Sequence, residues 1–128
     1  MNDMSQGQRR ELTAEQQWEQ FTVLKTADDY IDSLRGRNLD VYLLGERIEE
    51  PVDHPIVRPS INAMAESYIL AAEDPDLATA WSSISEQQIN RFLHVPESAE
   101  DLVQKNKMQR RMGQLTGTCF QRCAGLDT

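Results

Sequence analysis

The chain has 128 residues, of which 39% are hydrophobic and 27% charged, and its formal net charge is −8. This length fits one ordinary domain, and no apolar run approaches the roughly eighteen residues that span a membrane. The acidity disfavours nucleic acid as a partner, because phosphate contacts dominate that affinity. Residues 1–10 lack the apolar core of a secretory signal, so we expect a cytoplasmic protein with no membrane partner.

The charge is unevenly distributed along the chain. Residues 51–104 carry nine acids and two bases, whereas residues 105–128 carry five bases and one acid. The basic segment is either a solvated helix face that balances acidic neighbours or a surface that meets a phosphorylated small molecule. Composition alone leaves both interpretations open.

Residues 1–25 are predicted to be a polar extension with a short amphipathic helix at about 14–24. The ordered body is predicted to begin at Thr26, because Thr-Ala-Asp-Asp is a capped helix start with acids at the positive end of the helix dipole. Tyr30, Ile31 and Leu34 form the apolar stripe of this helix. The pair Arg35-Gly36 is typical of a helix end.

Residues 39–48 are predicted to form a small β-hairpin. The stretch 41–44 is rich in β-branched and aromatic residues, and we expect Gly45-Glu46 to make the turn. Two strands alone are marginally stable, so the hairpin should lie against helices.

A second helix is predicted over residues 59–73, with Pro59 in its first turn. Apolar residues recur there at helical spacing, at Ile61, Met64, Ala65, Tyr68, Ile69 and Ala72. The preceding loop contains His54, which could be a base or a ligand. No second ligand lies near it in sequence, so a structural role is favoured.

Residues 74–97 give weaker signals. We predict a short helix over 77–81, an irregular or extended crossing over 82–90, and a loop anchored by Phe92 and Val95.

Ser98 then caps a long helix that runs to about Met112. Its candidate inward residues are Leu102, Val103 and Met108. The glycines at 113 and 117 predict a break or kink before a second helical piece that carries Cys119 and Cys123. The fold class is therefore mainly α.

The spacing of Cys119 and Cys123 is compatible with two roles. On a helix the i, i+4 spacing places both side chains on one face. A disulfide is disfavoured by the compartment and by the side-chain directions of such a pair. Structural zinc sites need four ligands, and no second Cys/His pair is present. Buried core thiols and half of a larger metal site both stay open.

The residues around the cysteines carry a specific resemblance. The runs Lys107-Met-Gln-Arg110 and Cys119-Phe-Gln-Arg-Cys123 closely resemble the N-terminal domain of 4-hydroxybutyryl-CoA dehydratases, which also isomerise vinylacetyl-CoA. Residues 26–34, 41–48 and 52–62 agree as well. The wider flavoprotein group includes 4-hydroxyphenylacetate 3-hydroxylases, which share the fold but lack this cysteine pair.

The resemblance implies that residues 26–128 are the helical N-terminal domain of an acyl-CoA dehydrogenase-like fold, in a fragment of a larger homotetrameric enzyme. It implies FAD and a [4Fe–4S] cluster held by three cysteines and one histidine. Cys119 and Cys123 match the first two cluster ligands, and Arg122 beside them would favour ionised thiols. The remaining ligands and the catalytic glutamate, tyrosine and lysine are expected beyond residue 128. No flavin-binding residue is assigned.

Two further residues match positions near the acyl-CoA substrate. By resemblance Gln121 reaches the substrate pocket, and Arg110 lies near the acyl-CoA site. The alternatives are a helix-surface amide for Gln121 and an ion pair with an upstream acid for Arg110. We expect the chain alone to bind no cofactor stably and to be inactive. A flavin-dependent monooxygenase acting on a phenol, or a non-enzymatic helical protein with core cysteines, are the other interpretations.

Overall fold

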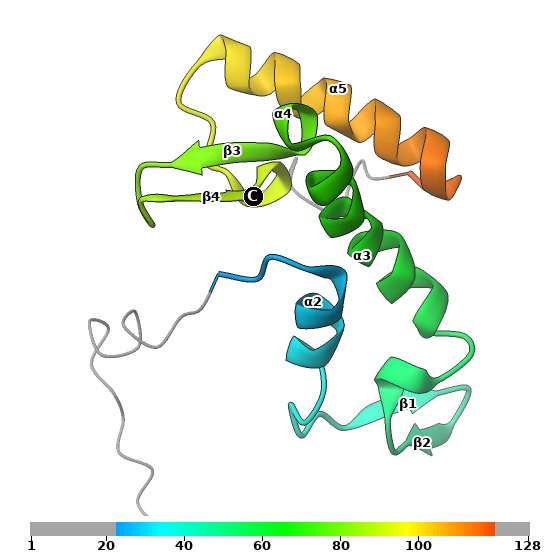
Figure 1. Ribbon diagram of the computed structural model, residues 1–128. Coiled ribbons are helices and arrows are strands. Elements are labelled where there is room, and N and C mark those ends of the chain that lie inside the picture. The colour runs from blue at the N-terminus through cyan, green and yellow to red at the C-terminus, as the bar shows by residue number, and fades with distance from the viewer. Residues whose placement is uncertain (1–22, 120–128) are drawn as a thin grey trace, which may run out of the picture.

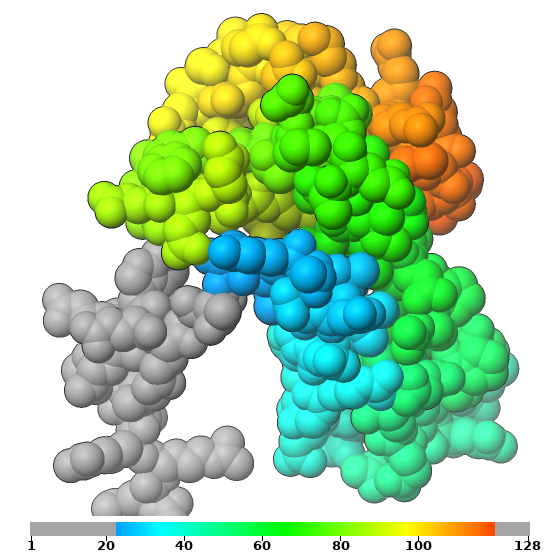
Figure 2. All heavy atoms as spheres, in the orientation of Figure 1, coloured from blue at the N-terminus to red at the C-terminus, as the bar shows by residue number. Residues whose placement is uncertain are grey.

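The computed structural model describes residues 23–119. Its two long helices are α3 (Arg58–Glu73) and α5 (Ala99–Thr116). Figure 1 shows a hairpin, β1 (Val41–Leu43) and β2 (Glu46–Ile48), near the start of α3, and a second hairpin near its end. The short helix α2 (Ala27–Ser33) packs on α3, and Figure 2 shows its segment lying between the two hairpin regions. The mainly helical fold with a small hairpin is confirmed.

Helix α2 begins as predicted. The Thr26 hydroxyl accepts a hydrogen bond from the Asp29 amide, and the Asp29 carboxylate accepts one from the Thr26 amide, both at 3.0 Å. This reciprocal capping box satisfies two helix N–H groups that would otherwise lack acceptors. The Tyr30 ring stacks on the Tyr68 ring of α3, with 5.5 Å between centroids. The helix is therefore held by its cap and by this aromatic contact.

The first hairpin is present, but its turn is one residue earlier than predicted. Val41 pairs with Ile48 and Leu43 with Glu46, so Leu44 and Gly45 form the turn. Both turn residues have positive φ, 52° and 87°. A two-residue turn with positive φ at both positions matches the right-handed twist of the strands, which explains the shift from Gly45-Glu46.

Helix α3 has almost the predicted bounds. A 3-10 turn, η1 (Pro51–Asp53), precedes it and contacts it. The predicted stripe is right at Ile61, Ala65 and Tyr68, which are buried. It is wrong at Ile69, which is 40% exposed, because the neighbouring Leu70 takes the inward position. It is also wrong at Ala72, which is exposed near the end of the helix.

Residues 74–97 differ most from the prediction. The short helix α4 is Pro75–Ala78, where the Asp74 carboxylate caps the Leu77 amide, and the chain turns extended at Thr79. The remaining elements are β3 (Thr79–Ser82), β4 (Gln87–Asn90) and the 3-10 turn η2 (Arg91–Leu93). β3 and β4 form a second antiparallel hairpin. The extended alternative predicted for residues 82–90 is therefore right for β4, whereas the pairing of β4 with β3 was not predicted. β4 begins with two exposed glutamines. Its sequence therefore lacks the alternation of apolar and polar side chains that identifies a strand.

The core lies where α3, α4, η2 and α5 meet. Its members are Leu70, Ala78, Phe92, Met108 and Met112. The anchoring role predicted for Phe92 is confirmed, but Val95 is 57% exposed.

Helix α5 starts after the predicted Ser98 cap, whose hydroxyl accepts from the Asp101 amide. The inward prediction is right for Met108 but wrong for Leu102 and Val103, which are 49% and 45% exposed. The buried residues of α5 are Lys105, Met108 and Met112, which are spaced three and four apart and so share one face. Among the described residues, no helix is long and apolar enough to cross a membrane.

Candidate functional site

Cys119 lies just after the end of α5. The helix continues through Gly113 and ends at Thr116 with Gly117 as a left-handed cap, φ 66°. The interruption predicted from the two glycines therefore occurs at Gly117 and not at Gly113. Cys119 is therefore not on α5, and it is exposed. Cys123 and Gln121 lie outside the described residues, as does the rest of the predicted second helical piece.

A pocket of about 300 Å³ opens beside Cys119. It lies between α2 and α3 and is lined by Tyr30, Ser60, Ile61, Ala63, Met64, Thr118 and Cys119. Ile61, Ala63 and Met64 give the lining its apolar surface, and Tyr30, Ser60 and Thr118 carry hydroxyl groups. The described lining contains no carboxylate. The sequence pattern placed Tyr30 and Met64 on inward stripes but did not indicate that they share a pocket with a cysteine.

Tyr30 lines this pocket, and its ring stacks on the ring of Tyr68. Tyr68 is only 3% exposed, and burial raises the pKa of its phenol. Burial also raises the pKa of Tyr30, while the positive charge of Arg37 acts in the opposite direction. Both phenols therefore stay protonated at neutral pH and can donate hydrogen bonds.

Arg110 is exposed on α5. Within residues 23–119 no acid lies within ion-pair distance of its guanidinium, so the upstream ion pair considered for it is not formed there. Lys107 and Arg111 are also exposed on this helix. The outer side of α5 therefore presents three cations.

Metal-ligating side chains do not gather within the described part of the chain. No group of three or more His, Cys, Asp or Glu residues there could hold a metal ion. His54 has a local contact instead, since its Nδ1 accepts a hydrogen bond from the Ile56 amide at 3.2 Å. Its carbonyl accepts from the Arg58 amide at 2.8 Å, which places His54 at the first turn of α3.

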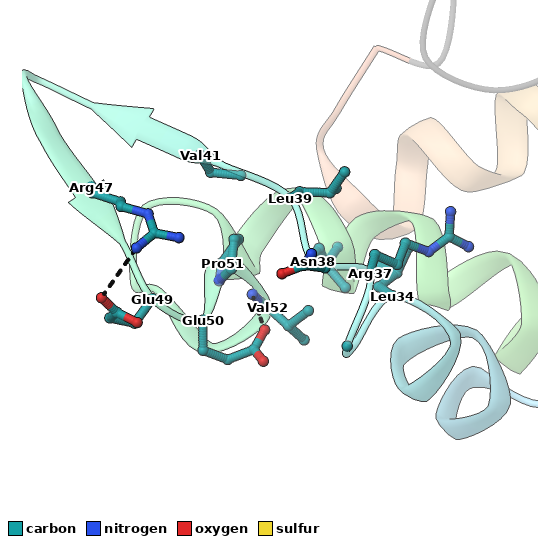
Figure 3. Close-up of a pocket in the computed structure, with 12 residues that line it drawn as sticks. Leu34, Arg37, Asn38, Leu39, Val41, Arg47, Glu49, Glu50, Pro51 and Val52 are labelled. Atoms are coloured by element: carbon teal, nitrogen blue, oxygen red, sulfur yellow. Dashed lines mark hydrogen bonds and ion pairs between the residues drawn. The ribbon is translucent and has the colours of Figure 1, made fainter. Parts of the chain in front are cut away.

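A larger pocket of about 500 Å³ lies between the end of α2 and the first hairpin. Its floor includes Leu34 and Val52, and Figure 3 shows Arg37 and Arg47 on opposite sides of it. The Arg47 guanidinium already pairs with Asp40 at 2.8 Å and contacts Glu49 at 4.0 Å. The charge of Arg47 is thus balanced by acids that flank the hairpin, and the pocket lining also carries the carboxylates of Glu49 and Glu50 along with Arg37.

A third pocket, of about 390 Å³, is polar and lies under the second hairpin. There the buried His94 ring contacts the Asp101 carboxylate, with 3.4 Å between Nε2 and Oδ2. A hydrogen bond from the Glu97 amide, followed by contacts from His94 and Ser98, lowers the pKa of Asp101. These contacts fix the start of α5, which is a structural role.

Comparison with known proteins assigns residues 26–128 to one family. Residues 26–128 match the family model described as 4-hydroxyphenylacetate 3-hydroxylase N terminal. The chain is 52% identical over 108 residues to a 4-hydroxybutyryl-CoA dehydratase/vinylacetyl-CoA-Δ-isomerase of Clostridium aminobutyricum, covering 82% of this chain and 22% of that protein. It is 23% identical over 92 residues to the 4-hydroxyphenylacetate 3-monooxygenase oxygenase component of a Geobacillus species, covering 72% of this chain and 19% of that protein.

A solved structure agrees with these similarities. An oxygen-tolerant archaeal 4-hydroxybutyryl-CoA dehydratase from N. maritimus matches with a TM-score of 0.73 and 64% identity, over 79% of this chain and 20% of that one. The predicted resemblance to the N-terminal region of such dehydratases is confirmed. The chain spans about a fifth of the length of the proteins it matches.

Proposed function

Because the chain belongs to the 4-hydroxyphenylacetate 3-hydroxylase N-terminal family, we propose that it forms the N-terminal part of a 4-hydroxybutyryl-CoA dehydratase. The observation that carries the proposal is the much higher identity to a dehydratase than to a monooxygenase of the same family. Residues 26–128 are the helical domain and residues 1–25 a polar extension. The reaction is the dehydration of 4-hydroxybutyryl-CoA to crotonyl-CoA, with isomerisation of vinylacetyl-CoA, in a cytoplasmic homotetramer that uses FAD.

Cys119 fits the donor set of a [4Fe–4S] cluster. Its thiol is exposed beside a pocket whose described lining offers no carboxylate, and cluster irons take thiolate ligands. Cys119 and Cys123 would be two of the ligands, and the others would come from elsewhere in the enzyme. When bound, the cluster would act mainly as a Lewis acid on the substrate hydroxyl.

The remaining site residues act on the substrate. Arg110 has its guanidinium exposed and without an acid partner in the described region, so it is available to a phosphate of the acyl-CoA. Gln121 would place its amide in the substrate pocket, between the two ligands in sequence. Tyr30, protonated and stacked on Tyr68, lines the pocket beside Cys119.

The chain alone should be inactive, because two thiolates cannot enclose a four-iron cluster. Reconstitution of the 128-residue chain with iron and sulfide should give no stable iron–sulfur absorption. In a longer enzyme that carries this chain, Cys119→Ser should abolish both iron binding and crotonyl-CoA formation. The matched control is Leu44→Ser, at an exposed hairpin tip. Normal iron content and activity in Cys119→Ser would refute the proposal.

A flavin-dependent monooxygenase acting on a phenol is the second candidate, because the family also includes the monooxygenase component. Iron content separates the two functions. A longer enzyme that contains no iron and hydroxylates a phenol with reduced flavin and oxygen would establish this candidate instead.

A further inference from the structure

The end of α5 is tied to the residues that follow it by one hydroxyl group. Thr116 Oγ1 donates to the carbonyl of Met112 at 2.8 Å. The same oxygen lies 2.6 Å from Thr118 Oγ1 and accepts from the Thr118 amide at 3.3 Å. Because the hydrogen of Thr116 is already used, the Thr118 hydroxyl must be the donor in the short contact. Thr116 therefore links the last turn of the helix to residue 118.

The chain also reverses direction at this point. Gly117 has φ 66°, and its amide donates to the carbonyl of Gly113 at 3.0 Å. A Cβ on Gly113 would meet the Thr118 carbonyl oxygen at 3.5 Å, so the chain folds back against the last turn of α5. Side chains other than glycine are strained at this φ. The reversal thus depends on Gly117.

This reversal decides where Cys119 lies. A helix that continued past Thr116 would carry the thiol along the surface of α5, by about 1.5 Å per residue. Instead, Cys119 lines the pocket between α2 and α3 with Tyr30 and Met64. The pocket walls come from two helices far from Cys119 in sequence, so the placement of the thiol against them requires the turn.

We infer that Thr116 and Gly117 are positioning residues for Cys119 and hold its thiol at the pocket between α2 and α3. What Cys119 ligates rests on the proposed function. The placement itself is a property of this chain and can be measured without any cofactor.

The test uses the 128-residue chain with Cys123→Ser, so that a thiol-specific nitroxide reacts only at Cys119. Thr116→Val removes the hydroxyl, and Gly117→Ala strains the reversal. Each should increase the mobility of the nitroxide in the electron paramagnetic resonance spectrum, with a correlation time shorter by a factor of about two or more. Circular dichroism verifies that each variant is folded. If Gly117→Ala fails to fold, the nitroxide mobility of Thr116→Val alone tests the inference.

Two matched controls separate positioning from general loss of stability. Thr116→Ser keeps the hydroxyl and should leave the spectrum unchanged. Gly36, after the end of α2, has φ 65°, and a Cβ added there would meet no atom within 4 Å, as at Gly117. Gly36→Ala therefore introduces the same backbone strain at a different place in the fold. It should not mobilise the label. Equal mobility in the parent and Thr116→Val, or equal loosening by Gly36→Ala, would overturn the inference.

Iron content distinguishes this inference from the proposed function. In the longer enzyme Thr116→Val should hold less iron per protomer than Thr116→Ser. A longer enzyme that never binds iron would refute the proposed function, while the nitroxide result would stand.

Discussion

The side-chain amide of Asn90 donates a 2.7 Å hydrogen bond to the hydroxyl of Ser67, which joins β4 to α3 inside the protein. Asn90 is 3% exposed and Ser67 is fully buried. The side-chain oxygen Oδ1 of Asn90 accepts from the Phe92 amide at 3.0 Å, and the Ser67 hydroxyl donates to the backbone carbonyl of Met64 at 2.8 Å. This small polar network lies beside the core and positions η2 against α3.

Ser67→Ala should destabilise the protein by about 1–3 kcal/mol, because it leaves the buried Asn90 amide without its acceptor. Urea unfolding measures the change. Ser85→Ala is the control, since the buried Ser85 hydroxyl has no hydrogen-bond partner in the described structure. An equal loss in both variants would show that the Asn90–Ser67 bond is not the cause.

Lys105→Met should stabilise the protein at neutral pH by about 1 kcal/mol, the low end of the gains seen when buried ion pairs are replaced by apolar residues. Lys105 is 3% exposed, no ion pair reaches it within residues 23–119, and burial lowers the pKa of its ammonium. A lowered lysine pKa destabilises the folded state below that pKa, and the penalty disappears as pH rises past the unfolded value of about 10.4. The gain measured by urea unfolding should therefore shrink toward that pH.

Lys107→Met is the matched control for this prediction, because Lys107 is exposed on the same helix. It should change the urea midpoint little. A destabilised Lys105→Met protein would mean that the ammonium has a favourable role in the fold.

Asp53→Asn should lower the urea midpoint at neutral pH. Two hydrogen bonds from Arg35, at 2.7 and 2.9 Å, and the nearby charge of Arg58 lower the pKa of the Asp53 carboxyl. A lowered aspartate pKa contributes stability above the unfolded value of about 3.9, and that contribution is lost as pH falls through the folded value. The difference between parent and variant should therefore vanish in acid.

Asp32→Asn provides the comparison for Asp53. Asp32 also approaches Arg35, at 3.6 Å, but its side chain is 77% exposed. Asp32→Asn should lower the urea midpoint at neutral pH less than Asp53→Asn does. A larger decrease for Asp32→Asn would contradict the role given to Asp53.

Arg110→Gln in the longer enzyme should raise KM for 4-hydroxybutyryl-CoA by about tenfold or more, as expected for loss of one charge-assisted phosphate contact. Arg111→Gln removes the same charge from the neighbouring position and should raise KM less. Steady-state kinetics measure both. Equal effects would indicate a general electrostatic contribution from α5 rather than a specific contact.

Local signals were enough to predict several elements. The Thr26 capping box, the periodicity of α3 and the Ser98 cap of α5 all depend on residues within a few positions of each other. Leu102 and Val103 could not be assigned to the outer face in this way, because the inward face of α5 is set by its contact with α3, α4 and η2. The spacing of apolar residues along α5 does not indicate which elements pack against it.

The site was predictable only in part. The motif identified Cys119, but its helical placement was wrong, because Gly117 reverses the chain two residues earlier. The pocket walls at Tyr30 and Met64 depend on the packing of α2 against α3, which joins residues more than thirty positions apart along the chain. Single-sequence periodicity carries no information about that pairing.

The turn of the first hairpin has a consequence for the order in which the protein folds. Leu44 adopts φ 52° while 90% exposed, a conformation that costs a side-chain-bearing residue about 1–2 kcal/mol. Of the six strand residues in β1 and β2, only Ile48 is buried, so this hairpin has little internal stabilisation. It should therefore form late, once η1 has docked on α3, and an excised peptide of residues 39–50 should be unstructured in water.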